Sequence, residues 1–229
     1  MSARGDYEYA ESGLARLPRT AKSDRREAAV QLVEGRSHHD EVVMKAVLGA
    51  RVSIWIATAN LKDVRVEAPI GTSARARGRY ISILERLSDL VTRGVEVRIL
   101  HGGTPSGPFA ESLRKSRSLR APGFELRQCP RVHLKIVAVD GAYLYLGSAN
   151  FTGAGLGAKG DGRRNFELGL STDDDVLLDA TQLLFDRIWT GRECGGCRLR
   201  AQCPKPLDGG GGKPASASRP RRVAKGRRA

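Results

Sequence analysis

Aromatic side chains are scarce in this sequence, since Phe, Trp and Tyr together make up 5% of its 229 residues. A nucleic-acid-binding surface built on stacked aromatic rings is therefore not favoured. Long apolar runs are also missing: the longest, VSIWIATANL (residues 52–61), is far shorter than the roughly 20 residues that cross a bilayer. The first 25 residues contain no apolar segment of a signal peptide. The sequence thus predicts a soluble, cytoplasmic protein with no transmembrane segment.

Acidic residues are outnumbered, because 25 Asp and Glu stand against 39 Lys and Arg and give a formal net charge of +14. This balance favours a polyanionic partner, either nucleic acid or an anionic membrane surface. Half of the excess lies in residues 213–229, which hold seven Lys and Arg and follow a run of four glycines. Residues 207–229 are predicted to be a disordered basic tail. The tail is either a solubilising end or a nonspecific phosphate-binding arm.

Apolar periodicity predicts alternating strands and helices through the middle of the chain. This order favours an α/β fold, a layered mixed β-sheet flanked by helices, over residues 28–190. A polar N-terminal arm, residues 1–27, precedes it. Helices are expected at about 26–36, 40–48, 79–94, 109–118 and 173–189, and strands at about 51–59, 95–100, 124–129 and 166–171, with a hairpin between the last two strands.

The hairpin, VHLKIVAVDGAYLYLGSANFT (residues 132–152), carries polar residues that a buried sheet rarely tolerates. Asp140 and Gly141 form a typical two-residue turn, which would pair Val139 with Ala142. In that register His133 lies opposite Ser148, and His133 and Lys135 share one face. An imidazole, an ammonium and a hydroxyl would then meet at the open end of the hairpin, which suits an anionic ligand.

The hairpin resembles the HKD motif of the phospholipase D superfamily with no departure. The positions that match are His133, Lys135, Asp140, Gly147, Ser148 and Asn150. The resemblance implies a phospholipase D-like domain and a metal-independent phosphodiesterase, with no cofactor for catalysis. In such enzymes one histidine attacks phosphorus to form a phosphohistidine, while a second histidine protonates the leaving oxygen and later activates water.

The resemblance also assigns roles around the attacking His133. Lys135 and Asn150 would bind the nonbridging phosphate oxygens. Glu167 matches the acidic residue that orients the histidine; the alternative is a strand glutamate that faces solvent. Ser148 would hydrogen-bond within the site, and Gly147 belongs to the structural part of the motif. Asp140 lies at the far turn in the expected register, so it is interpreted as structural.

The mechanism needs two reactive histidines, and the motif supplies one. The others, His38, His39 and His101, have no lysine two residues later. A twofold-symmetric homodimer that sets two hairpins face to face is therefore expected.

Basic loops on both sides of the hairpin favour a nuclease that acts on DNA or RNA. These loops contain Arg75, Arg77 and Arg79 before the hairpin and Lys159, Arg163 and Arg164 after it. The alternatives are a solvated basic surface, a phospholipid phosphodiesterase or transferase, and a catalytically silent nucleic-acid-binding module. The intact motif argues against the silent module.

Cysteine is rare, with four residues in the chain, and a cytoplasmic location favours reduced or metal-bound thiols. Cys194, Cys197 and Cys203 form a C-x2-C-x5-C pattern in a Cys-rich segment, residues 191–206. This spacing suits a structural zinc, with Cys129 or a histidine such as His38 or His39 as the fourth ligand. It is also similar to the C-terminal cysteine cluster of certain iron–sulfur nucleases. Three unliganded thiols are the remaining alternative.

Overall fold

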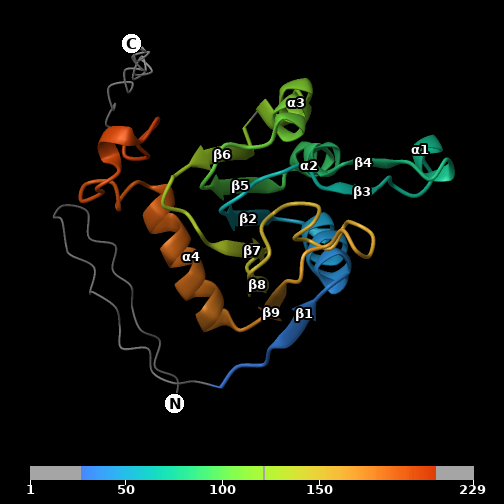
Figure 1. Ribbon diagram of the computed structural model, residues 1–229, viewed down its shortest axis with the longest axis horizontal. Helices are drawn as coiled ribbons and strands as arrows, with labels where there is room; N and C mark the ends of the chain where they lie inside the picture. The colour runs from blue at the N-terminus through green and yellow to red at the C-terminus, as the bar shows by residue number, and fades with distance from the viewer. Residues whose placement is uncertain (1–26, 121, 210–229) are drawn as a thin grey trace, which may run out of the picture.

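The computed structural model describes residues 27–120 and 122–209 (Figure 1). Much of the predicted N-terminal arm and of the basic tail therefore lies outside the described residues. The described chain forms a seven-stranded sheet in the order β1-β9-β8-β7-β2-β5-β6. Its strands are β1 (Gln31–Glu34), β2 (Ser53–Thr58), β5 (Glu96–His101), β6 (Phe124–Gln128), β7 (Lys135–Val139), β8 (Tyr143–Gly147) and β9 (Leu168–Thr172).

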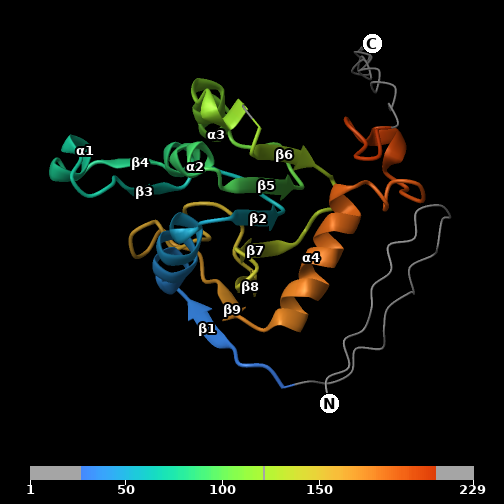
Figure 2. The same cartoon turned by 180° about the vertical axis from the view of Figure 1, so that it is seen from behind.

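The sheet is mixed, because β2, β5 and β6 are parallel while the other neighbouring strands are antiparallel. A separate two-stranded sheet, β3 (Arg65–Glu67) with β4 (Tyr80–Ser82), extends away from the body and carries α1 (Ser73–Ala76) at its end (Figures 1 and 2). The predicted α/β fold, a mixed sheet flanked by helices, is confirmed.

Helices cover both faces of the large sheet because its strands alternate apolar residues between two cores. On one face η1 (His38–Val47) and α2 (Ile83–Thr92) pack with α3 (Gly107–Lys115) and η2 (Ser118–Arg120) nearby. On the other face α4 (Asp175–Trp189) inserts Phe185 and Trp189 against Leu100 and Leu144. A last short helix, η3 (Arg200–Gln202), follows α4. Within the described residues no helix is long and apolar enough to cross a membrane.

Two of the predicted helices, at 26–36 and 79–94, are wrong over part of their length. Residues 31–34 form an edge strand rather than part of a helix, because β1 pairs with β9 and buries Val33. The helix expected at 79–94 begins only at Ile83. Ser82 ends β4 and also caps α2, since its hydroxyl accepts from the Leu84 amide and the Glu85 carboxylate accepts from the Ser82 amide.

The hairpin turn is where the sequence predicts it, but the register of the strands is not. Asp140 and Gly141 both have positive φ (54° and 63°), and the Ala142 amide donates to the Val139 carbonyl at 3.0 Å. The ladder then pairs Val139 with Tyr143, so Ala142 is an extra residue on its strand, as in a β-bulge. This shift of one residue overturns the predicted pairing of His133 with Ser148.

Asp140 joins the hairpin turn to the start of β2. Its carboxylate accepts hydrogen bonds from the amides of Arg51 (2.9 Å), Val52 (2.8 Å) and Ser53 (2.8 Å). Partial burial acts to raise the pKa of this carboxyl, but the amide bonds from Ser53, Val52 and Arg51 outweigh it and hold the pKa below its ordinary value. Asp140 thus has its hydrogen-bond partners at the end of the sheet away from His133.

Asp140→Asn is expected to lower the free energy of unfolding at pH 7 by about 1.5–3 kcal/mol, since the ionised acceptor is lost while asparagine still tolerates positive φ. The native pKa is depressed, so the carboxylate stabilises the fold above its unfolded pKa of about 4 and loses this effect as the pH falls through the native pKa. The difference between the two proteins should therefore shrink below about pH 4. Urea unfolding measures the difference in the free energy of unfolding, and Asp89→Asn, at an exposed position on α2, is the control. Equal stabilities of the wild type and Asp140→Asn at pH 7 would contradict a stabilising role of the Asp140 carboxylate.

Candidate active site

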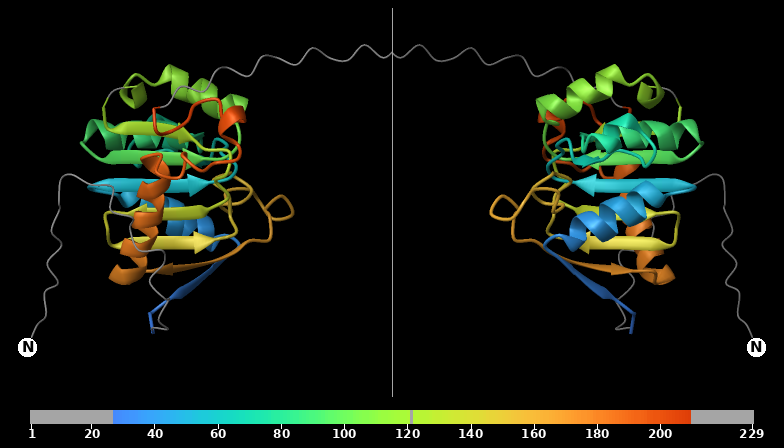
Figure 3. Two further views of the ribbon diagram at one scale, coloured as in Figure 1. Left: turned by 90° about the vertical axis from the view of Figure 1, so that its left-hand side faces the viewer. Right: turned by 90° about the vertical axis from the view of Figure 1, so that its right-hand side faces the viewer.

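The motif residues of the hairpin other than Asp140 gather at one end of the sheet, which we call the catalytic edge. β2, β5 and β8 end there, and β7 begins there, because β8 and β5 run parallel to β2 while β7 runs antiparallel to it. The long connection after β8, residues 148–167, projects from this edge (Figure 3). Side chains from distant parts of the chain can therefore meet there.

His133 and Lys135 lie in contact at the catalytic edge. His133 is exposed and precedes β7, whereas Lys135 is the first residue of that strand and is half-buried. The Lys135 ammonium lies 3.0 Å from Nδ1 of His133 and donates to its carbonyl oxygen at 2.8 Å. Burial lowers the pKa of Lys135, while the negative charge of Glu167 acts to raise it. The pair thus presents an accessible imidazole beside a cation.

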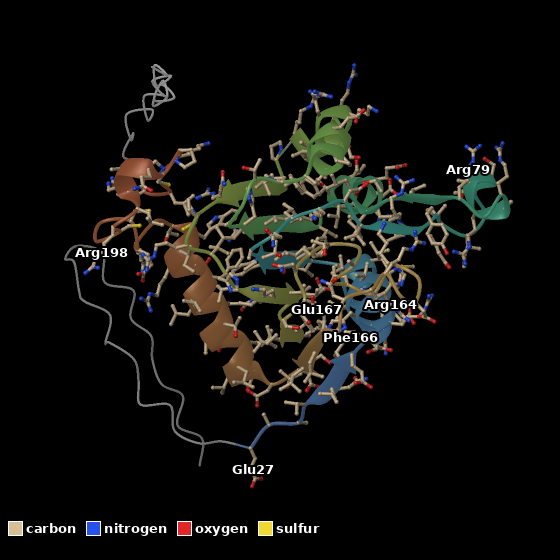
Figure 4. The ribbon with its side chains drawn as sticks, viewed as in Figure 1. Glu27, Arg79, Arg164, Phe166, Glu167 and Arg198 are labelled. Atoms are coloured by element: carbon tan, nitrogen blue, oxygen red, sulfur yellow. The ribbon has the colours of Figure 1, made fainter. Side chains whose placement is uncertain are left out.

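Glu167 is held by two hydrogen bonds. The Ser148 hydroxyl donates to Oε2, and the Asn165 amide nitrogen donates to Oε1 at 3.0 Å. The Ser148 oxygen in turn accepts from the Leu168 amide at 3.1 Å. Glu167 thus hydrogen-bonds Ser148 and Asn165, and its negative charge acts on Lys135. Figure 4 shows Glu167 between the sheet and the loop that carries Arg164.

Asn150 is fixed by residues that follow β2. Its Oδ1 accepts from the Asn60 amide at 3.0 Å and faces the Thr58 hydroxyl at 3.4 Å. These contacts turn the acceptor end of the amide toward the protein and leave the Nδ2 donor end on the other side. Thr58 also accepts from the Phe151 amide at 2.9 Å. Asn150 is therefore oriented as a donor.

The sequence does not point to Thr58 or Asn165 as site residues, nor to the buried pair Tyr145 and His38 that packs behind the motif. Tyr145 is a buried residue of β8, and the Nε2 atom of the buried His38 lies 2.9 Å from its hydroxyl. Burial raises the pKa of Tyr145 to about 12 and lowers the pKa of His38. A Cβ atom at Gly147 would collide with the Tyr145 hydroxyl, so a side chain larger than glycine does not fit at this position of the motif. The spacing of His38 and Tyr145 in sequence gives no signal of this contact.

The predicted basic residues do not form one patch. Arg75, Arg77 and Arg79 lie near the end of the β3–β4 extension, and Arg75 pairs with Glu67. The other three lie in the loop between Asn150 and Glu167, where Arg164 pairs with Asp161. That loop adjoins the catalytic edge, since Asn165, near its end, contacts Glu167.

A family model described as "Cardiolipin synthase, PLD-like domain" matches residues 43–189, which is more than half of the chain. The chain belongs to the phospholipase D-like family. This match extends well beyond the hairpin and confirms the resemblance that the motif indicates. No curated protein sequence matches the chain.

Solved structures are also similar to the chain. The phospholipase D family member Nuc from Salmonella typhimurium is similar at 20% identity and a TM-score of 0.50, over 72% of this chain and 95% of Nuc. NucT from Helicobacter pylori matches at 16% identity and a TM-score of 0.46, over 70% of this chain and 95% of NucT. The likeness to Nuc supports the phospholipase D-like fold.

Proposed function

We propose that this protein is a metal-independent nuclease that cleaves phosphodiester bonds through His133. The observation that carries the proposal is the exposed imidazole of His133 beside the Lys135 ammonium at the catalytic edge. Neighbouring Asn150 offers an amide donor from the same edge. An imidazole nucleophile flanked by donors for an anion suits attack on a phosphodiester.

The reaction proceeds in two displacements. The His133 imidazole attacks phosphorus and forms a P–N bond while the P–O bond to the leaving group breaks. A second histidine gives its proton to the leaving oxygen, and the same histidine then takes a proton from the water that hydrolyses the phosphohistidine. Lys135 and the Asn150 amide stabilise the charge on the nonbridging oxygens. Glu167 acts as an electrostatic partner of Lys135 that keeps the ammonium charged.

The second histidine comes from another copy of the chain. Among the described histidines, His38 is bonded to Tyr145, His39 is buried beside Asp40, and His101 bonds to the Gly103 carbonyl. None of them shares the contacts of His133 and Lys135. A twofold homodimer supplies His133 twice, once as nucleophile and once as general acid.

A partner is also favoured by an exposed apolar surface, which we call the bare apolar face. Leu32 and Leu170 are paired across β1 and β9 on the same side as α4, and they are 56% and 43% exposed. Leu168 shares this side, and α4 adds Val176 and Leu183 from its outer surface. In Figure 1 α4 lies along one side of the sheet, and β1 is the edge strand beyond β9. Apolar residues rarely remain exposed in such a group without a partner.

The bare apolar face continues toward the catalytic edge. Phe166, which precedes Glu167, is fully exposed, and Leu168 follows it at the start of β9. A sheet surface and the outer side of α4 lie next to each other on one chain, so α4 of each copy can cover the strands of the other. The occupant that we propose for this face is therefore a second copy of the chain.

Nucleic acid is the substrate class that the charge favours, given a net charge of +14 and basic residues in the loop beside Glu167. The test is incubation of the protein with single-stranded and plasmid DNA, RNA, and anionic vesicles, with and without EDTA. Cleavage of nucleic acid in both conditions supports a metal-independent nuclease. Release of lipid headgroup instead would make the protein a phospholipid phosphodiesterase or transferase, and DNA retention without turnover would make it a silent binding module.

Arg77→Gln together with Arg79→Gln is expected to weaken DNA binding without changing the cleavage step. Both side chains are exposed near the end of the β3–β4 extension, away from His133. If both contact phosphates, the slope of log K against log salt should become shallower by about 2. Fluorescence anisotropy across a salt series measures it. Arg114→Gln together with Lys115→Gln on α3 removes the same two charges and is the control. An unchanged slope for the Arg77, Arg79 variant would remove the extension from the DNA-binding surface.

A further inference from the structure

All four cysteines of the chain line one cavity, although Cys129 lies 65 residues before Cys194 in sequence. The cavity is formed by the end of β6 and the chain after α4. Within the described residues all four thiols are free of disulfides. Cys194, Cys203 and Cys197 each act electrostatically on Cys129, whose pKa is raised first of all by burial. The fold thus brings the distant Cys129 to the C-x2-C-x5-C segment.

The backbone that carries Cys194, Cys197 and Cys203 forms a series of tight turns. The Cys197 amide donates to the Cys194 carbonyl at 3.2 Å, the Arg200 amide to the Cys197 carbonyl at 3.1 Å, and the Cys203 amide to the Arg200 carbonyl at 3.2 Å. Each bond joins residues three positions apart and closes a four-residue turn. Cys129 is fixed in a turn of its own, because the Val132 amide donates to its carbonyl at 2.9 Å.

The segment that carries these cysteines has little core. Of residues 191–209, only Gly191 and Pro206 are buried. Arg127 of β6 holds the end of α4, from which the segment departs: its guanidinium lies 4.3 Å from the centre of the Trp189 ring and donates to the Trp189 carbonyl at 3.0 Å. Glu193 of the segment pairs with Arg187 of α4. A segment with so few apolar contacts is the kind that a metal stabilises in small folds.

We propose that Cys129, Cys194, Cys197 and Cys203 together bind one zinc ion as a structural centre. Four thiolates suit the tetrahedral preference of zinc. Binding displaces four thiol protons and leaves a net charge of two negatives on the centre. Arg131, Arg200 and Glu193 line the same cavity, and Arg200 pairs with Asp208 at 2.6 Å while it donates to the Cys194 carbonyl at 3.2 Å. Arg131 is the cation that offsets part of this charge.

The thiols of the described chain border the cavity without being gathered around one point, since no three His, Cys, Asp or Glu side chains there are placed to hold an ion. Zinc binding therefore requires the four thiols to converge, to which a change of χ1 rotamer at each cysteine can contribute. A histidine is not the fourth ligand. His38 is bonded to Tyr145, and His38 and His39 lie on η1, which packs on the opposite face of the sheet from α4.

The zinc centre would hold the C-terminal segment against the chain that leads into the catalytic edge, because Cys129 precedes His133 by four residues. It would act on His133 by positioning and take no part in the reaction. This inference is independent of the substrate, and its readouts below are metal content and thermal stability, so its failure is distinguishable from failure of the nuclease proposal.

The test begins with metal analysis of the full-length protein purified without added metal. The expected result is one zinc per chain, and exchange with Co²⁺ should give the intense near-ultraviolet absorption of thiolate–cobalt bonds. Cys129→Ser and Cys197→Ser should each lose the metal under dialysis that leaves the wild type loaded, with a lower melting temperature. Arg198→Ser and Ala201→Ser, exposed positions in the same segment, are the matched controls and should retain the metal (Figure 4).

Three results would overturn the proposal. Wild-type protein that contains no zinc and develops no thiolate–cobalt absorption has no such centre. An iron–sulfur chromophore would show that the cluster holds iron instead of zinc. Cys129→Ser that retains zinc as firmly as the wild type would remove Cys129 from the ligand set.

Discussion

His133→Ala should abolish phosphodiester cleavage, with a fall in turnover of at least roughly 10⁴-fold. The imidazole is the proposed nucleophile, and in a homodimer the same substitution also removes the general acid from the other half of the site. The expected loss is therefore larger than for a single acid–base residue. Initial rates on a defined oligonucleotide, at substrate concentrations above and below KM, measure it.

The fold should survive this substitution, because His133 is exposed and the strand begins only at Lys135. The melting temperature of His133→Ala should thus match that of the wild type, and binding of DNA should remain. Lys115→Ala, an exposed surface position on α3, is the control and should keep full activity. A His133→Ala protein that cleaves within tenfold of the wild type would exclude His133 as the nucleophile.

Lys135→Ala should reduce cleavage less, by about 10²–10³-fold, since it removes one donor to the developing charge. It also frees Glu167 from its cationic neighbour. A Lys135→Arg variant keeps the charge and should recover part of the rate, which a purely structural role of Lys135 would not predict.

Local patterns predicted most of the central sheet. Ile54 and Ile56 in β2 alternate with less apolar residues, and Asp140-Gly141 adopts the turn with positive φ that its composition predicts. The motif residues are close in sequence, so short-range geometry brings His133 and Lys135 into contact wherever the hairpin forms.

The failures arise where a distant segment decides the structure. Ala142 became a bulge, which no feature of the hairpin sequence signals, and this shift separated Ser148 from His133. Ser148 instead meets Glu167, because β9 pairs with the end of β8. Residues 31–34 have helical spacing in isolation, and pairing with β9 made them a strand. Tertiary pairing outweighs local propensity at each of these positions.

Leu170→Arg should split the dimer and remove activity together. Leu170 lies in the middle of the bare apolar face, and an arginine there would be buried against apolar residues of the partner without an acid to pair with. The side chain is 43% exposed in the single chain, so the fold itself should be preserved. Sedimentation velocity should give the monomer mass, with cleavage reduced by at least roughly 100-fold because each half-site lacks its second histidine.

Val52→Arg is the matched control, since Val52 is 65% exposed. Its amide binds the Asp140 carboxylate, at the end of the sheet opposite the catalytic edge. It should remain dimeric and active. A Leu170→Arg protein that is monomeric and fully active would show that one chain suffices, and a Leu170→Arg protein that is still dimeric would place the interface elsewhere.

Mixing separates a shared active site from two independent ones. When wild type and His133→Ala are refolded together, a shared site is active only in wild-type homodimers, so activity follows the square of the wild-type fraction. At a ninefold excess of His133→Ala, activity per wild-type chain should fall to about one tenth, whereas independent sites would leave it unchanged. The double variant Leu170→Arg, His133→Ala cannot enter the dimer and should not inhibit at the same excess. This pair of results requires that His133 acts from both chains and that the bare apolar face is the surface through which they meet.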